Sequence, residues 1–173
     1  MKKSVKILGI VVIILGLFVL LLYVDGRIGV SKANIESDAR RSQKIDESWA
    51  AAKDISEDMA ALIFYSKDKS DFTYAIYIRR PKVLFSKGYF FRGAGSAAES
   101  RSHIQHFYDF SYEGVKSEAF VSMNKCKINR IELNNRTIEI DKDKPFAVVM
   151  PINSDPHFYN DEGEYVDIMK TKL

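Results

Sequence analysis

The run ILGIVVIILGLFVLLLYV, residues 7–24, decides where the rest of the chain lies. Its eighteen residues include no charged residue and no proline. A helix rises about 1.5 Å per residue, so this run would span about 27 Å, close to the hydrocarbon thickness of a bilayer. We therefore expect residues 7–24 to form a transmembrane helix.

The charges that flank this run predict its orientation. Lys2, Lys3 and Lys6 precede it, and no acidic residue occurs before Asp25. Under the positive-inside rule, residues 1–6 would form a cytoplasmic stub and the remainder would be extracytoplasmic. The predicted localisation is the cell membrane, crossed in a single pass.

A cleaved signal peptide is the alternative interpretation of the same run. Ser31 and Ala33 place small residues at −3 and −1 of a cleavage site, and cleavage near Ala33 would release a secreted protein. However, the apolar run exceeds the roughly 7–15 residues usual for a signal peptide. Asp25, Arg27 and Lys32 also make the approach to the site charged. An uncleaved signal-anchor is favoured.

Composition excludes one class of function and limits another. All 23 acidic residues follow residue 24, as do 23 of the 26 basic residues, so the exported part is formally neutral. Nucleic-acid binding requires a strong positive excess and is not expected. Cys126 is the single cysteine, so no intramolecular disulfide forms, and we expect it to be a buried small hydrophobic residue.

Residues 25–34 contain two glycines and are predicted to be a short juxtamembrane joint. Residues 35–63 then show helical periodicity, which predicts an amphipathic helix whose apolar side packs on the domain that follows. A coiled-coil stalk is the alternative for this helix. The apolar side would comprise Ile45, Trp49, Ala52, Ile55, Met59, Leu62 and Ile63.

Residues 64–173 are predicted to form a β-rich extracytoplasmic domain. After Ser66 the period changes to two, and residues 72–78 predict a half-buried strand that ends before Pro81. Further strands are expected at residues 83–85, 89–91, 104–112, 119–123 and 146–150. The last is continuously apolar, which indicates a central strand.

Turn residues predict two hairpins. In the first, a four-residue loop at 134–137 would pair Leu133 with Ile138 and Ile131 with Ile140. In the second, residues 158–159 pair with 165–166, and Gly163 takes the left-handed conformation. Eight to ten such short strands indicate an antiparallel sandwich or barrel-like fold.

A search for catalytic and metal-binding motifs identifies none with a specific signature. His103 and His106 could share a metal on a helix, but in a strand they would point to opposite faces, and His157 has no evident partner. Residues 92–96 (RGAGS) lack the third glycine of a dinucleotide fingerprint and the Gly-Lys-Ser/Thr of a P-loop. They are expected to be a flexible loop between strands. We expect no enzyme activity, metal or cofactor.

Charge is unevenly distributed along the exported part. Residues 79–101 include six basic residues and one acid, whereas residues 139–167 include eight acids and two lysines. Such segregation is typical of a two-patch binding protein; the alternative is a pair of solvated strand edges, where charges suppress aggregation. The basic residues that could bind a ligand or partner are Arg79, Arg80, Lys82, Lys87, Arg92 and Arg101.

These patterns favour a non-enzymatic, single-pass membrane protein whose exported β-rich domain binds a partner at the cell envelope. The partner could be another protein, an anionic wall polymer or lipid head groups. A second hypothesis is an accessory subunit of a membrane complex that acts through the helix at residues 7–24. An extracytoplasmic hydrolase without a recognisable motif is the third.

Overall fold

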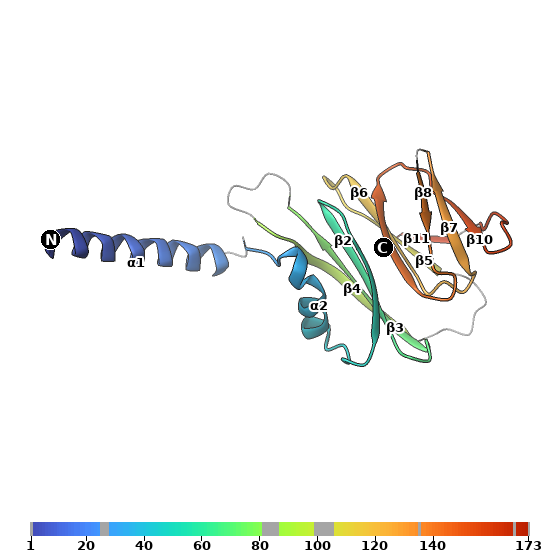
Figure 1. Cartoon of the computed structure of the whole chain (residues 1–173), viewed down its shortest axis with the longest axis horizontal. Coiled ribbons are helices and arrows are strands. Elements are labelled where there is room, and N and C mark those ends of the chain that lie inside the picture. Colours follow the sequence, from blue (N-terminus) through green and yellow to red (C-terminus); the bar gives the residue numbers. More distant parts are fainter. Residues whose placement is uncertain are drawn as a thin grey trace.

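The computed structural model describes residues 2–24, 28–80, 87–98, 106–134, 136–167 and 169–172. Over these residues the protein is mostly β, with antiparallel sheets and few helices (Figure 1). A long N-terminal helix, α1 (Lys2–Val24), projects away from the sheets. A short 3₁₀ turn, η1 (Lys32–Asn34), leads into α2 (Ile35–Gln43).

The strands of the described residues form three sheets. The first sheet has the order β1-β2-β3-β4 and contains β1 (Ala50–Ile55), β2 (Met59–Tyr65), β3 (Asp71–Ile78) and β4 (Phe90–Ala98). The second has the order β11-β5-β6-β9 and contains β5 (His106–Ser111), β6 (Ser117–Ser122), β9 (Phe146–Pro151) and β11 (Met169–Lys172). The third has the order β10-β7-β8 and contains β7 (Ile128–Leu133), β8 (Arg136–Glu139) and β10 (His157–Asn160). Among the named strand pairs, β11 with β5 is the parallel one.

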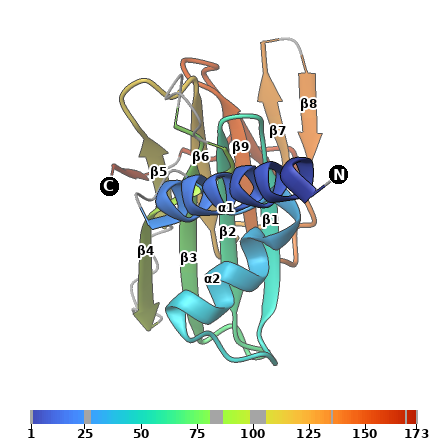
Figure 2. The same ribbon diagram turned by 90° about the vertical axis from the view of Figure 1, so that its left-hand side faces the viewer.

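The sheets stack in layers, and α2 covers the outer face of the first (Figure 2). Side chains alternate across a strand, so Met59, Ala61 and Ile63 of β2 pack toward the second sheet, while Leu62 and Phe64 pack toward α2. All seven residues of β2 are buried because both of its faces are covered. This stacking is consistent with the sandwich that the strand pattern predicts.

The second sheet is the middle layer. Ala119 and Val121 of β6 join the core shared with the first sheet, whereas Phe120 joins the core shared with the third. There the rings of Phe120 and Phe158 pack edge to face, with centroids 5.7 Å apart. The same strand therefore contributes to two cores.

Large apolar side chains of α1 are exposed, with Leu21 66 % and Val24 76 % accessible. Within the part of the chain that the structure describes, no helix is both long enough and apolar enough to cross a membrane. A membrane span at residues 7–24 stays a prediction.

The prediction of an amphipathic helix over residues 35–63 is wrong beyond Gln43. The helix α2 ends there, Lys44 takes a left-handed conformation with φ 54°, and residues 50–65 form the antiparallel hairpin β1–β2. Helical spacing of apolar residues is satisfied by chance in this segment, since β2 is buried on both faces and needs no alternation. The β-rich part therefore begins at Ala50, not at residue 64, and no coiled-coil stalk is formed here.

The first predicted hairpin exists, but its predicted loop length is wrong. Leu133 lies opposite Arg136 and Ile131 lies opposite Ile138, so two residues connect β7 to β8 instead of four. Ile131 is buried in the third-sheet core, and Leu133, Ile138 and Ile140 pack against that core. The second hairpin is confirmed, because Tyr159 forms a β-bridge with Tyr165 and Gly163 has φ 81°.

The strand β9 was expected to be central, but in hydrogen bonding it is an edge strand of the second sheet. It is nevertheless buried because it lies between the first and third sheets. The carboxylate of Asp54 on β1 accepts a hydrogen bond of 2.9 Å from the Val149 amide. This contact satisfies a donor on an edge that another chain could otherwise pair with.

Residues 92–96 belong to β4, so the predicted flexible loop is wrong there. Gly95 lies directly opposite Tyr74, whose ring also packs on Phe110 with centroids 4.9 Å apart. A Cβ at Gly95 would overlap the Tyr74 ring. The glycine therefore permits close packing within a strand and does not mark a loop. The strand predicted at 83–85 and the start of that predicted at 104–112 lie outside the described residues.

Replacing Gly95 by valine should destabilise the fold by about 1–3 kcal/mol, the usual cost of overpacking. Urea unfolding followed by Trp49 fluorescence would measure this change. Tyr74→Ala should lower the free energy of unfolding less in the Gly95→Val variant than in the wild type. The reason is that removing the Tyr74 ring also removes its overlap with the valine. Additive losses would contradict this explanation.

Asp58 joins the β1–β2 turn to the second sheet. Its carboxylate accepts hydrogen bonds from the hydroxyls of Ser56 and Ser117 and from the Lys116 amide. Burial raises the pKa of Asp58, but these hydrogen bonds together lower it more, so the pKa lies below the ordinary value for aspartate. The ionised form is thus the one that holds the two sheets together here.

We expect Asp58→Asn to lower the free energy of unfolding at pH 7 by about 1–3 kcal/mol, typical of lost hydrogen bonds to a charged group. Because the folded-state pKa is below the unfolded value, this stabilisation is present above the unfolded pKa and is lost as the pH falls through the folded pKa. The difference from the wild type should therefore narrow between pH 7 and about pH 3. Urea unfolding at both pH values measures it, with the exposed Glu47→Gln as control; a difference independent of pH would contradict the role of the carboxylate.

Candidate functional site

The basic segment predicted to bind a partner is described in part. Four of its six residues lie in the described ranges and all four are exposed, namely Arg79, Arg80, Lys87 and Arg92. The other two, Lys82 and Arg101, lie outside the described residues. We call the four described residues the basic end.

Strand pairing brings these residues to one end of the first sheet. Ile78, the last residue of β3, lies opposite Phe90, the first residue of β4. Arg79 and Arg80 follow β3 immediately, and Lys87 lies shortly before β4. The three cations therefore share the same end of an edge hairpin, although six residues separate Arg80 from Lys87 in the sequence.

The chain segment that follows α1 is hydrogen-bonded to this same end. Ile28 bridges Lys87 in parallel and Val30 bridges Tyr89 in antiparallel fashion. The amide of Gly29 donates to the Lys87 carbonyl at 2.7 Å, and Val30 and Tyr89 exchange two hydrogen bonds of 2.8 Å. The predicted juxtamembrane joint at residues 25–34 thus contains a short β-ladder, which holds the basic end next to the residues that follow α1.

Glycines make this ladder possible. A Cβ at Gly29 would lie 2.5 Å from the Tyr89 carbonyl oxygen. Gly88 has φ 87°, and its Cβ would lie 2.7 Å from the Val30 carbonyl oxygen. Side chains at either position would push the two segments apart, so the close approach requires glycine.

Aromatic rings hold two of the arginines. The guanidinium of Arg80 lies over the Phe90 ring at 4.3 Å, and that of Arg92 lies over the Tyr112 ring at 5.4 Å. Burial raises the pKa of Tyr112, and Arg92 partly offsets this. A guanidinium stacked by its face keeps its N–H edges available to carboxylate or phosphate oxygens.

A β-bulge in β4 sets the direction of the Arg92 side chain. Ile76 lies opposite Gly93 and Tyr77 lies opposite Phe91, so Arg92 is the extra residue on β4. Bulges bend an edge strand and redirect a side chain. Here the bulge places the Arg92 guanidinium over the second sheet's Tyr112.

Other charges lie close to the basic end. The Lys32 ammonium donates a hydrogen bond of 3.2 Å to the Ile55 carbonyl. Lys116 lies beside Asp58, because its amide donates to the Asp58 carboxylate. Two acids, Glu57 and Asp58, occupy the β1–β2 turn, where the Asp58 carbonyl accepts the Arg79 amide at 2.7 Å. The donors to the Asp58 carboxylate are neutral and leave its charge in place, but Lys32, Lys116 and the four cations of the basic end outnumber the two acids.

The acidic segment at residues 139–167 lies elsewhere. Its strand β10 and the turn that follows belong to the third-sheet layer, which Figure 1 shows on the side of the domain opposite α1, whereas β9 belongs to the middle layer. Its two lysines pair within it, Lys142 with Asp161 at 2.7 Å and Lys144 with Asp141 at 2.8 Å. The acids of β10 and of the turn after it therefore lie away from the basic end, although Ile152 of the same segment donates its amide to the Lys116 carbonyl beside Asp58.

The residues singled out for metal or thiol chemistry do not gather in one place. In the described ranges no three His, Cys, Asp or Glu residues are placed to hold a metal ion. His106 begins β5 and His157 is exposed on β10, while His103 lies outside the described residues. Cys126 is half-buried beside the third-sheet core, and burial raises the pKa of its thiol to about 11. The thiol is therefore protonated at neutral pH and weakly nucleophilic.

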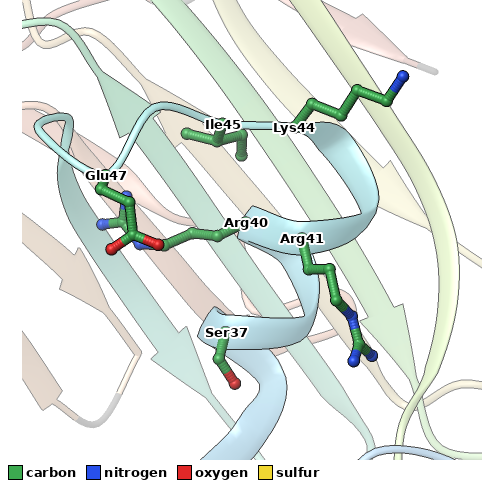
Figure 3. Close-up of a pocket in the computed structure, with 6 residues that line it drawn as sticks. All are labelled: Ser37, Arg40, Arg41, Lys44, Ile45 and Glu47. Carbon is green, nitrogen blue, oxygen red and sulfur yellow. The ribbon is translucent and has the colours of Figure 1, made fainter.

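An open concavity of about 590 Å³ lies beside α2 (Figure 3). It is lined by Ser37, Arg40, Arg41, Lys44, Ile45 and Glu47. Arg40 already donates to the Glu36 carboxylate and to the Trp49 carbonyl. Figure 3 shows Arg41 and Lys44 pointing in different directions. Because these cations do not converge, the concavity is a weaker anion site than the basic end.

Sequence reasoning identified the arginines but missed what holds them. Phe90 and Tyr112 were recognised only as strand residues, and the ladder at residues 28–30 was described as a joint. The apolar pair Ile28 and Val30 on either side of Gly29 is a weak strand signal that could have indicated the ladder.

Comparison with known proteins gives no relative from which a function could be transferred. No protein-family model matches the chain, and no curated protein matches it.

Proposed function

We propose that this chain is a non-enzymatic, single-pass membrane protein whose extracytoplasmic β-rich domain binds a partner at the cell envelope through the basic end. The observation that carries the proposal is the ladder between residues 28–30 and 87–89. It places the exposed cations beside the segment that leaves α1. A ligand of the basic end would then meet the protein close to its anchor.

Attachment to a membrane is supported by the sequence of α1. The uncharged run covers residues 7–24, while the structure describes the α1 side chains of residues 7–22 and Val24. Those side chains lie outside the sheets and are largely exposed, and a continuous apolar surface of this kind is unfavourable in water. Three lysines before the run favour a cytoplasmic N-terminus.

The anchor can be tested by Val12→Arg with Leu15→Arg. Each arginine near the centre of a transmembrane helix costs about 2.5–3.5 kcal/mol. We expect the wild type to resist alkaline carbonate extraction from membranes, and the double variant to be extracted. Protease added outside intact cells should digest the β-rich domain and leave the stub at residues 1–6. Extraction of the wild type, or a mature protein cleaved near Ala33, would contradict the proposal.

The binding role can be tested by reversing charge at the basic end with Arg79→Glu, Arg80→Glu and Lys87→Glu. Envelope material that is captured by the full chain should decrease at least tenfold, and capture by the wild type should fall with added salt. Bound protein, phosphorus-containing polymer and phospholipid would be quantified separately. The matched control reverses three exposed cations elsewhere, Arg41, Lys67 and Arg136. Equal capture by all three proteins would rule out the basic end as the binding surface.

A further inference from the structure

We infer that the basic end binds the phosphate head groups of anionic phospholipids in the membrane that holds α1. The inference rests on the proposed function, since it requires residues 7–24 to be inserted. It names the ligand, which the proposed function leaves as any anionic or protein partner.

Covalent reach limits how far the basic end can lie from the membrane. Ile28 lies four positions after Val24, the last residue of α1, and an extended chain spans at most about 3.6 Å per residue. Ile28 therefore lies within about 14 Å of the end of the helix. The bridge to Lys87 adds one strand spacing of about 5 Å. This limit of about 20 Å applies to the backbone of Lys87 and holds for any path of the connecting residues.

That distance is comparable with the reach of the membrane's own charge. The head-group layer is about 5–7 Å thick on each side of the hydrocarbon core. The field of an anionic surface extends about one Debye length, roughly 8 Å at physiological salt, beyond it. A lysine or arginine side chain bridges the remaining gap. Figure 1 shows this end of β3 and β4 on the side of the domain where α1 joins it.

The side chains at the basic end suit phosphate. The guanidinium groups of Arg80 and Arg92 lie over the rings of Phe90 and Tyr112, and that of Arg92 can present its N–H edges without a large loss of side-chain freedom. Arg79 and Lys87 add two exposed cations beside them. The arrangement is a cluster of separate phosphate contacts at a surface, not an enclosed pocket.

Exposed apolar side chains accompany these cations. Ile28 is 40 % exposed on the ladder beside Lys87. Phe91 is 45 % exposed on the α2 side of β4, where it packs on Tyr77, whereas Arg92 lies on the other side over Tyr112. A surface that combines basic and apolar side chains matches the boundary between head groups and acyl chains better than it matches a fully hydrated wall polymer. This combination favours lipid over polymer.

Acids near the basic end oppose the attraction but do not cancel it. Glu57 and Asp58 lie in the β1–β2 turn, and Glu113 follows Tyr112 in the sequence. The Asp58 carboxylate keeps its charge, because its hydrogen-bond donors, the Ser56 and Ser117 hydroxyls and the Lys116 amide, are neutral. Lys32 and Lys116 add positive charge at the same end, so the cations outnumber the acids.

The test uses the full chain reconstituted in bilayers that contain spin-labelled phosphatidylglycerol or spin-labelled phosphatidylcholine. Electron paramagnetic resonance gives the fraction of each lipid immobilised by the protein. One basic residue near an anionic surface corresponds to about a fivefold preference. We expect the wild type to favour phosphatidylglycerol at least fivefold, and this preference should fall as salt rises.

The variant Arg79→Gln, Arg80→Gln and Lys87→Gln should lose most of this preference, to below about twofold. The matched variant Arg41→Gln, Lys67→Gln and Arg136→Gln removes the same charge away from the basic end and should keep it. Circular dichroism would establish that both variants are folded, and carbonate extraction that both are inserted.

Distinct outcomes separate the inference from the proposal on which it rests. A chain that is extracted by carbonate removes the proposed anchor and the inference with it. An inserted wild type with equal affinity for the two lipids overturns the inference alone, as does an equal loss in both triple variants. Displacement of the labelled lipid by soluble poly(glycerol phosphate) at an equal phosphate concentration would assign the site to a wall polymer and overturn the lipid assignment.

Discussion

The rest of the structure depends on the burial of the first sheet on both faces. One face of β2 packs on α2 and the other on the second sheet, and every residue of this strand is buried. Apolar burial is worth roughly 25 cal/mol per Å², so a strand buried twice holds two layers to one another. Cross-layer polar contacts reinforce it, because Asp54 and Asp58 each bind an amide of the second sheet. β3 and β4 are therefore attached to a strand, β2, that is packed on both faces.

The packing of the first sheet on both faces explains how exposed cations can form a defined surface. The basic end lies where β3 and β4 meet, and two of its guanidinium groups lie over aromatic rings of β4 and of the turn after β5. Charges on edge strands commonly suppress aggregation, and the cations of β4 can serve that purpose too. Stacking over rings, a bulge that redirects Arg92 and a glycine-dependent ladder to residues 28–30 go beyond what edge protection requires. They support a binding role for the same residues.

The layered order also separates the two charged segments. The basic end belongs to the first sheet, beside the residues that follow α1, while the acids of β8, β10 and the turn after β10 lie in the third-sheet layer on the opposite side (Figure 1). Lysines within the acidic segment neutralise part of it locally. If α1 is inserted in a membrane as we propose, this polarity would present cations toward the membrane and most acids away from it, which would lower repulsion from an anionic membrane surface.

Features governed by neighbouring residues could be predicted from the sequence by itself. They include the helix that contains residues 7–24, the alternating strand β3, the turn at Gly163 and the clustering of basic residues in one segment. The sequence failed where burial on both faces removed the alternation, as in β1 and β2, and where a glycine served packing across strands, as at Gly95 opposite Tyr74. Only the tertiary structure decided that residues 28–30 pair with 87–89 and that Arg92 lies over Tyr112. Those partners are distant in sequence, and such contacts depend on how layers stack, which local residue patterns do not encode.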